Sequence, residues 1–441
     1  MPRSFDTLLK GGTVVDHTGV GARDIGIRDG KIAEIGDLSR ASAGETLTVQ
    51  GLHVLPGVID TQVHFREPGA AHKEDLETGS RAAVLGGVTA VFEMPNTSPL
   101  TIDAAALADK MARAKGRMHC DFAFWVGGTH DNWRDIPELE RLPGAAGIKV
   151  FMGSSTGSLL VADDFGIARI LGETRRRAAF HCEDEDRLEE RKDLRVAHDP
   201  GSHPVWRDET VALRATERLL RIAREKRALI HVLHVSSGAE MDLLAAHKDI
   251  ASVEVTPHHL TLSADDYGRL GTKLQMNPPV RDKSHRDRLW YAVAQSIADI
   301  LGSDHAPHTL EEKAKPYPQS PSGMTGVQTL VPIMLDHVNK GRLSLLRVID
   351  MTSAGPARLF GIAGKGRIAA GYDADFTIVD LQRRETIQNR WIASRCGWTP
   401  YDGKEVQGWP VGTFVRGQKV MWEGELVTPG EGRAVRFWQA L

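Results

Sequence analysis

The sequence predicts an α/β fold, a (β/α)₈ barrel of the TIM type with a small β-sandwich domain built from both chain ends. Eight short apolar runs recur through the middle of the chain, and helical stretches separate several of them. An open doubly wound sheet would show the same alternation. Two observations favour the barrel: no G-x-G-x-x-G follows the first run, and polar residues stand at the carboxyl end of nearly every run, where barrels assemble active sites. The runs are residues 57–60, 89–92, 120–124, 147–151, 178–180, 229–233, 252–255 and 299–301.

Both chain ends show the pattern of β structure. Residues 24–28 and 31–35 alternate apolar and polar side chains around Asp29-Gly30, which is a two-residue hairpin signal. Near the other end, residues 374–379 form a further strand-like run. Each end is too small to fold alone, so we expect the two to pair. The predicted division is residues 1–56 and 365–441 for the sandwich, and residues 57–364 for the barrel.

The composition indicates a soluble globular protein rather than a nucleic-acid or membrane protein. Of 441 residues, 41% are hydrophobic and 26% charged, which suits a protein with a large core. The net charge of −3 gives no basic field for nucleic acid or anionic lipid, so we expect a small-molecule substrate. Three scattered cysteines, with neither a signal peptide nor an apolar run of membrane-spanning length, predict a cytoplasmic location.

Residues able to bind a metal stand at the ends of several predicted strands. Imidazoles and a carboxylate converging from four strands suit Zn²⁺ with one position open to water, and the same ligands suit Co²⁺ or Mn²⁺. Each residue alone is explained more simply as a hydrogen-bonding strand end or a turn. Their recurrence at equivalent strand ends favours a metal site. The candidates are Gln62, His64, Lys149, His181, His234 and Asp304.

Lys149 is unusual because it lies inside an apolar run, between Ile148 and Val150. A lysine there usually reaches outward to solvent. If it faces metal ions instead, the buried ammonium is unfavourable and the amine should be neutral or chemically altered. A neutral amine can take up CO₂, and the two oxygens of the resulting carbamate can bridge two metals.

The chain resembles the amidohydrolase superfamily and, within it, the dihydroorotases. The segment Gln62-Val63-His64-Phe65-Arg66-Glu67-Pro68-Gly69 is similar to H-x-H-x-R-E-P-G of that family. The most specific match is Ser303-Asp304-His305-Ala306-Pro307-His308-Thr309, continuing to Glu312-Lys313. The matching segments come in the family's order and span nearly the whole chain. The others are residues 72–75, 93–97, 257–260 and 277–281.

The resemblance implies a role for each matching position. His64 and Asp304 would bind one metal, His181 and His234 the other, and carboxylated Lys149 would bridge them. Glu254 stands where some relatives have an additional metal ligand. Arg66, Asn96 and His308 would bind the substrate carboxylate. Further substrate contacts would come from Asn277 and from the backbone of residues 323–326, which include Gly326.

The implied reaction is the reversible cyclisation of N-carbamoyl-L-aspartate to L-dihydroorotate, in de novo UMP biosynthesis. In the hydrolytic direction a metal-bound hydroxide would attack the ring carbonyl, with Asp304 as general base and then general acid. The implied cofactors are one or two Zn²⁺ per chain and a CO₂-derived carbamate on Lys149. The resemblance also implies a homodimer.

Gln62 departs from the family pattern, because it stands where the family has its first metal histidine. An amide oxygen is a weaker zinc ligand than imidazole. A dinuclear site with a poor first ion, a working mononuclear site and an inactive homologue that scaffolds aspartate transcarbamoylase all stay open. A hydantoinase or allantoinase is a further alternative, although Arg66 with His308 favours an anionic ring substrate.

Overall fold

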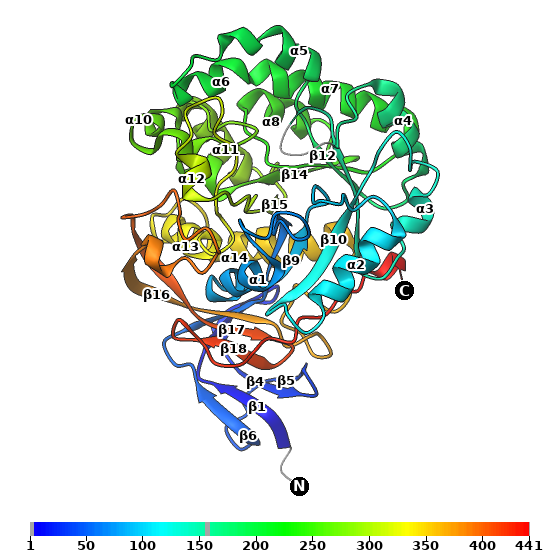
Figure 1. Ribbon diagram of the computed structural model, residues 1–441. Helices are drawn as coiled ribbons and strands as arrows, with labels where there is room; N and C mark the ends of the chain where they lie inside the picture. Colours follow the sequence, from blue (N-terminus) through cyan, green and yellow to red (C-terminus); the bar gives the residue numbers. More distant parts are fainter. Residues whose placement is uncertain (1–3, 155–158, 441) are drawn as a thin grey trace.

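Eight parallel strands at the centre of the molecule nearly close into a barrel (Figure 1). The computed structural model describes residues 4–154 and 159–440. The strands lie side by side in sequence order, and the His64 N–H donates to the His305 carbonyl at 2.7 Å where the last strand returns to the first. This arrangement confirms the predicted fold class. The strands are β8 (Val58–Val63), β9 (Val88–Glu93), β10 (Asp121–Gly127), β11 (Ala145–Phe151), β12 (Ala178–His181), β13 (Ile230–Val232), β14 (Ala251–Val255) and β15 (Ile300–Leu301).

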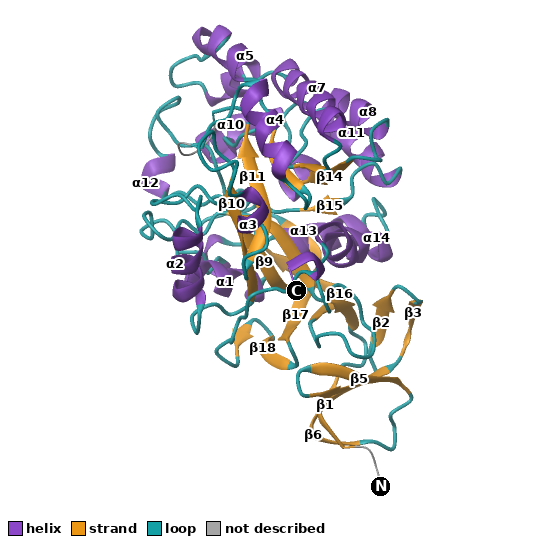
Figure 2. Ribbon diagram, turned by 90° about the vertical axis from the view of Figure 1, so that its right-hand side faces the viewer, coloured by secondary structure: helices purple, strands orange, loops and turns teal. Residues whose placement is uncertain are grey.

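Helices surround the barrel (Figure 2), and many begin at an aspartate whose carboxylate accepts a backbone N–H of the first turn. None of the helices in the described residues is long and apolar enough to cross a membrane. The helices are α1 (Leu76–Leu85), α2 (Ala104–Ala114), α3 (Ile136–Leu139), α4 (Asp164–Glu173), α5 (Glu185–Glu190), α6 (His203–Trp206), α7 (Glu209–Lys226), α8 (Gly238–Ala245), α9 (Pro257–Thr261), α10 (Tyr267–Leu270), α11 (Lys283–Ala294), α12 (Leu310–Lys313), α13 (Leu330–Asn339), α14 (Leu345–Ile349) and α15 (Gly355–Phe360).

The two chain ends join in β structure, as the sequence predicts. A four-stranded sheet has the order β5-β4-β1-β6, and a seven-stranded sheet has the order β19-β18-β17-β16-β7-β2-β3. In the second sheet β16 pairs with β7, so a strand from the N-terminal part of the chain lies beside one from the C-terminal part. The strands are β1 (Ser4–Lys10), β2 (Thr13–Asp16), β3 (Gly19–Ala22), β4 (Asp24–Arg28), β5 (Lys31–Gly36), β6 (Ser42–Thr48), β7 (His53–Pro56), β16 (Phe376–Thr386), β17 (Glu405–Val415), β18 (Gln418–Trp422) and β19 (Glu425–Leu426).

An aromatic cluster fills one part of the barrel and includes residues from far along the chain. Phe92 of β9 contacts Phe437 edge-on, with ring centroids 5.6 Å apart, and Trp125 of β10 contacts Phe360 at 5.4 Å. Ala434 also forms a parallel bridge to Phe122 of β10. The segment around residues 434–437 therefore packs against barrel strands, while the domain boundaries at residues 56 and 364 stay a prediction.

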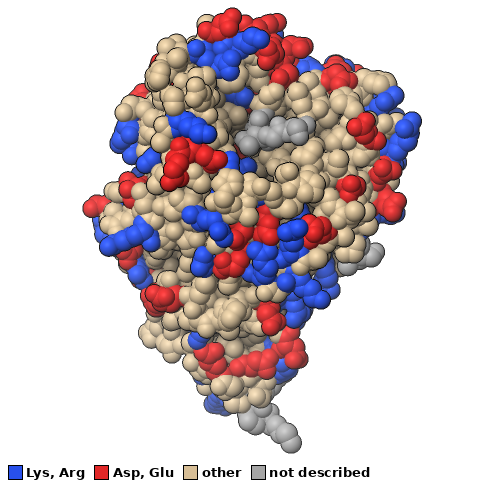
Figure 3. All heavy atoms as spheres, viewed as in Figure 1, with Lys and Arg blue, Asp and Glu red and all other residues tan. Residues whose placement is uncertain are grey.

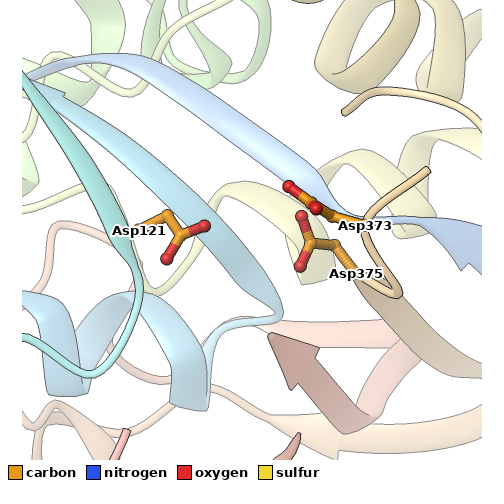
Figure 4. Close-up of side chains that lie close together, drawn as sticks. All are labelled: Asp121, Asp373 and Asp375. Atoms are coloured by element: carbon orange, nitrogen blue, oxygen red, sulfur yellow. The ribbon is translucent and has the colours of Figure 1, made fainter. Parts of the chain in front are cut away.

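Three buried aspartates lie close together where β10 meets the segment before β16 (Figure 4). Oxygens of Asp121, Asp373 and Asp375 lie within 4.8 Å of one another, a spacing that could hold a metal ion. The Lys365 ammonium takes that place, at 2.6, 3.1 and 2.6 Å from the three carboxylates. Burial acts to lower the pKa of Lys365, but the charges of Asp375 and Asp373 outweigh it and raise the pKa. The cluster is thus a structural ion pair network.

We expect Lys365→Met to destabilise the protein by about 3–5 kcal/mol, because the buried Asp375 carboxylate loses its charged partner. Lys31→Met is the matched control. It removes another lysine that pairs with Asp373, but the Lys31 side chain is 39% exposed and its loss should cost less than about 1 kcal/mol. Urea unfolding of the two variants measures the difference, and equal losses would contradict this account.

Candidate active site

A cavity at the carboxyl ends of the barrel strands collects most of the candidate residues. The cavity is narrow, with about 20 Å³ of space for the centres of water molecules. The sequence-predicted residues Gln62, His64, Arg66, Asn96, Lys149, His181, His234, Asn277 and Asp304 line it. Phe151, Ala306, Ser322 and Gly323 complete the wall.

The backbone is strained at three of these positions. Arg66, His234 and Asp304 have φ angles of 62°, 37° and 47°, in the left-handed region that side-chain-bearing residues rarely adopt. Such conformations cost on the order of 1–3 kcal/mol each and cluster at functional sites. Each of these residues follows a barrel strand (β8, β13 or β15) within three residues, so the strain lies where the chain turns out of the barrel.

Asp304 lies against Gln62 and His64 on one side of the cavity. The Gln62 amide donates from Nε2 to Asp304 Oδ1 at 3.1 Å, and His64 Nε2 lies 3.3 Å from the same oxygen. His64 Nδ1 lies 2.8 Å from Asn96 Oδ1. Burial lowers the pKa of His64, which favours a neutral imidazole. The β8 and β15 ends thus place an amide, an imidazole and a carboxylate together.

Lys149, His181 and His234 form the other side. Burial lowers the pKa of Lys149 to about 7, and its Nζ has no hydrogen-bond partner among the described residues. His181 Nδ1 lies 3.1 Å from His234 Nε2, and burial lowers the pKa of both imidazoles. A partly deprotonated amine and two imidazoles whose neutral form is favoured are therefore available as electron-pair donors.

Arg66 supplies a buried positive charge to the cavity wall. Its Nε donates to the Pro307 carbonyl at 3.2 Å, and Nη2 lies 3.3 Å from His308 Nε2. Within the described part of the chain, no carboxylate forms an ion pair with Arg66. His308 does not line the cavity but lies behind Arg66, and burial together with the charges of Arg66 and Lys73 holds its pKa well below the usual range.

Glu254 and Gly326 also lie behind the cavity wall. Glu254 accepts hydrogen bonds from Thr61 Oγ1 at 3.1 Å and from the His234 N–H at 3.3 Å, and burial raises its pKa to about 8. The Gly326 N–H donates to His305 Nδ1 at 3.1 Å. The metal and substrate roles expected for these two residues stay predictions.

The structure adds a pair that the sequence analysis did not select, Glu183 and Arg207. Glu183 Oε2 lies 2.8 Å from His181 Nε2, and Arg207 forms a buried ion pair with the same carboxylate. Burial acts to raise the pKa of Glu183, but the Arg207 charge and the bond to His181 hold it at about 2. The carboxylate accepts the His181 Nε2–H and directs the Nδ1 electron pair into the cavity. The only signal in the sequence is that Glu183 follows His181 by two residues.

Lys313, the last residue of the motif that begins at Ser303, holds two segments of the cavity wall together. Its buried ammonium donates to the carbonyls of Gln275, Pro321 and Gly323 at 3.2, 2.8 and 3.0 Å. These contacts hold the loop after α12 against the segment that leads to Asn277. The loop is therefore part of the cavity wall.

Comparisons with known proteins agree with this geometry. Residues 53–420 match the model of the Amidohydrolase family. The dihydroorotase of Halobacterium salinarum is 40% identical over 87% of this chain and 89% of its own length. The dihydroorotase of Methanothermobacter thermautotrophicus is 36% identical over 93% and 94%, and the allantoinase of Deinococcus radiodurans is 33% identical over 98% and 99%.

Among solved structures, the L-hydantoinase (dihydropyrimidinase) from Arthrobacter aurescens superposes with a TM-score of 0.94. It is 31% identical and covers 98% of this chain, which covers 100% of that one. These matches confirm the expected fold and the expectation of a cyclic amidohydrolase. The chain belongs to the amidohydrolase family.

Proposed function

We propose that this chain is a dihydroorotase, which interconverts N-carbamoyl-L-aspartate and L-dihydroorotate in de novo pyrimidine biosynthesis. The observation that supports this choice is Arg66, a buried guanidinium in the cavity wall with no carboxylate partner among the described residues. Buried charges are normally paired, so an anionic substrate would supply the missing partner. Dihydroorotate has a carboxylate on its ring, whereas hydantoin and allantoin have none.

The two alternatives from the sequence analysis, another cyclic amidohydrolase and an inactive scaffold, agree less well with these observations. A hydantoinase or allantoinase agrees with the similar relatives and structures, but leaves Arg66 buried without a counter-charge. The comparisons do not favour an inactive scaffold, because the similar relatives have the names of enzymes. Lys and Arg alternate with Asp and Glu over the face shown in Figure 3, which fits the expected small-molecule substrate.

The cavity fits a divalent cation of the kind on which the family generally depends. Three buried polar atoms of cavity residues, Lys149 Nζ, His234 Nδ1 and Gln62 Oε1, lack hydrogen-bond partners in the described structure. Zn²⁺ prefers neutral imidazole and carboxylate ligands of the type gathered here, and Co²⁺ or Mn²⁺ would also be accepted. When bound, the ion would lower the pKa of water and polarise the substrate carbonyl. The residues that would hold it are His64, Lys149, His181, His234 and Asp304, with Gln62 and Glu254 as further candidates.

The side chains have two kinds of role, proton transfer and substrate binding. In hydrolysis, Asp304 accepts the proton of the attacking water and delivers it to the departing ring nitrogen. The planar fork of Arg66 bonds two oxygens of the substrate carboxylate, while Asn96 and Asn277 approach from other strand ends. His308 lies behind Arg66, and its expected contact with the substrate carboxylate stays a prediction. Fixing the carboxylate holds the scissile bond next to Asp304, where orientation accelerates the reaction.

Three further expectations stay predictions within this proposal. They are a homodimer, an association with aspartate transcarbamoylase, and a cytoplasmic location.

We expect the purified protein to hydrolyse L-dihydroorotate, and Arg66→Lys to raise its KM by about 10–100-fold. A lysine keeps the charge but loses the two-pronged bond, a loss of about 1.5–3 kcal/mol. The measurement is steady-state turnover of L-dihydroorotate, with neutral hydantoin as comparison substrate. The exposed Arg113→Lys is the control. An unchanged KM in Arg66→Lys, or preferred turnover of hydantoin by the unmodified protein, would argue against the proposal.

We also propose that Lys149 reacts with CO₂ to give a carbamate, releasing one proton as the N–C bond forms. Its buried amine, with a pKa of about 7, is partly deprotonated at physiological pH and has no competing hydrogen bond in the described structure. Native mass spectrometry should show a gain of about 44 Da that disappears on acidification. The gain should be absent from Lys149→Met, and its persistence there would place the modification elsewhere.

Glu183→Gln should weaken metal binding by about 10–100-fold, because the variant no longer fixes the His181 tautomer. Competition with a chelator measures the affinity directly. Glu190→Gln, at an exposed position of α5, is the control and should bind like the unmodified protein. Equal affinity in both variants would show that Glu183 has only a structural role.

A further inference from the structure

We infer that Gln62 takes the place of one metal ion, so that the chain retains a single divalent cation on the Lys149, His181 and His234 side of the cavity. The inference rests on the proposed metal-dependent function and goes beyond it by assigning the number and position of the ions. It also gives the departure from the family pattern at Gln62 a defined role.

The contact between Gln62 and Asp304 is the first observation. Gln62 is 1% exposed at the end of β8, and its Nε2 lies 3.1 Å from Asp304 Oδ1. An amide nitrogen is only a donor, and an ionised carboxylate is only an acceptor, so this orientation is the favourable one. While Gln62 donates to Asp304, its nitrogen offers no electron pair to a cation.

The second observation is that Asp304 Oδ1 would have to accept the Gln62 N–H and also bind a cation. His64 Nε2 lies 3.3 Å from Asp304 Oδ1, the same atom that accepts the Gln62 N–H. A cation bound to this oxygen, between His64 and Asp304, would compete with the amide hydrogen bond. Binding there therefore weakens an existing buried hydrogen bond and gains, at best, the weak amide-oxygen ligand of Gln62.

On the opposite side of the cavity a cation would replace the contact between two imidazoles, but it would gain both imidazoles as ligands. His181 Nδ1 and His234 Nε2 lie 3.1 Å apart, and both imidazoles are buried. Glu183 already holds the other nitrogen of His181, at 2.8 Å. Lys149 Nζ has no hydrogen bond that a cation or a carbamate would have to displace, within the described residues. Two imidazoles and the Lys149 group outnumber the single imidazole on the Gln62 side.

The arrangement also assigns Gln62 a part in positioning the proposed general base. A carboxylate held by an amide N–H keeps its second oxygen, Oδ2, for proton transfer, because the donor occupies Oδ1. Asp304 then acts as a proton carrier that is held in place by hydrogen bonding rather than by a second ion. Gln62 is in this sense a positioning residue.

The experiment counts metal ions per chain in the unmodified protein and in Gln62→His, both loaded with zinc and bicarbonate and then gel-filtered. We expect one ion in the unmodified protein and close to two in Gln62→His, since the histidine restores an imidazole ligand and removes the amide donor. Gln62→Met is the matched control. It removes the N–H without adding a ligand, so it should keep one ion and lose turnover through kcat rather than KM.

Each outcome has a separate meaning. Two ions in the unmodified protein, or one ion in a folded Gln62→His, would overturn the inference and leave the proposed dihydroorotase activity standing. No ion in the unmodified protein would overturn the metal-dependent function itself. If Gln62→His fails to fold, the count in the unmodified protein decides alone, because only one ion agrees with the inference.

Discussion

Pairing of buried charge is the constraint on which this structure depends. Buried cations in the structural part of the fold form ion pairs: Lys365 with three aspartates, and Arg207 with Glu183. In the cavity two buried basic side chains lack such partners. Among the described residues, Arg66 forms no ion pair with a carboxylate and Lys149 Nζ forms no hydrogen bond. Leaving a buried charge without a partner is costly unless a ligand supplies one. Lys313, which also lacks a carboxylate, is surrounded by three backbone carbonyls instead.

The barrel and the convergence of its strand ends could be predicted from the sequence, because both follow from local patterns. Short apolar runs give the strands, and parallel strands bring their carboxyl ends to one edge, which unites residues as distant as His64 and Asp304. What could not be predicted is the depth of each side chain. His308 and Glu254 belong to strand ends too, but they lie one layer behind the cavity. The spacing of residues in the sequence predicts which face of a strand a side chain lies on, but not how far it lies from the barrel axis.

Contacts between distant segments were equally out of reach. Arg207 lies 24 residues beyond Glu183, just before α7, and nothing in its immediate surroundings marks it as the partner of a buried carboxylate. The three carbonyls that surround Lys313 come from loops with no regular pattern. Such contacts depend on how loops fold over the barrel, and loops are where sequence periodicity stops being informative. The supporting layer of this site is therefore visible only in three dimensions.

The aromatic cluster inside the barrel bears on how the chain reaches its native state. Asp121 and Arg433, which share a hydrogen bond beside this cluster, are 312 positions apart. Contacts of such long range form late, since the entropy of closing a large loop must be offset before they contribute. Until residues 434–437 arrive, Phe92 and Trp125 lack part of their final packing. A barrel that formed before this segment packed would leave apolar surface open to water, which favours aggregation.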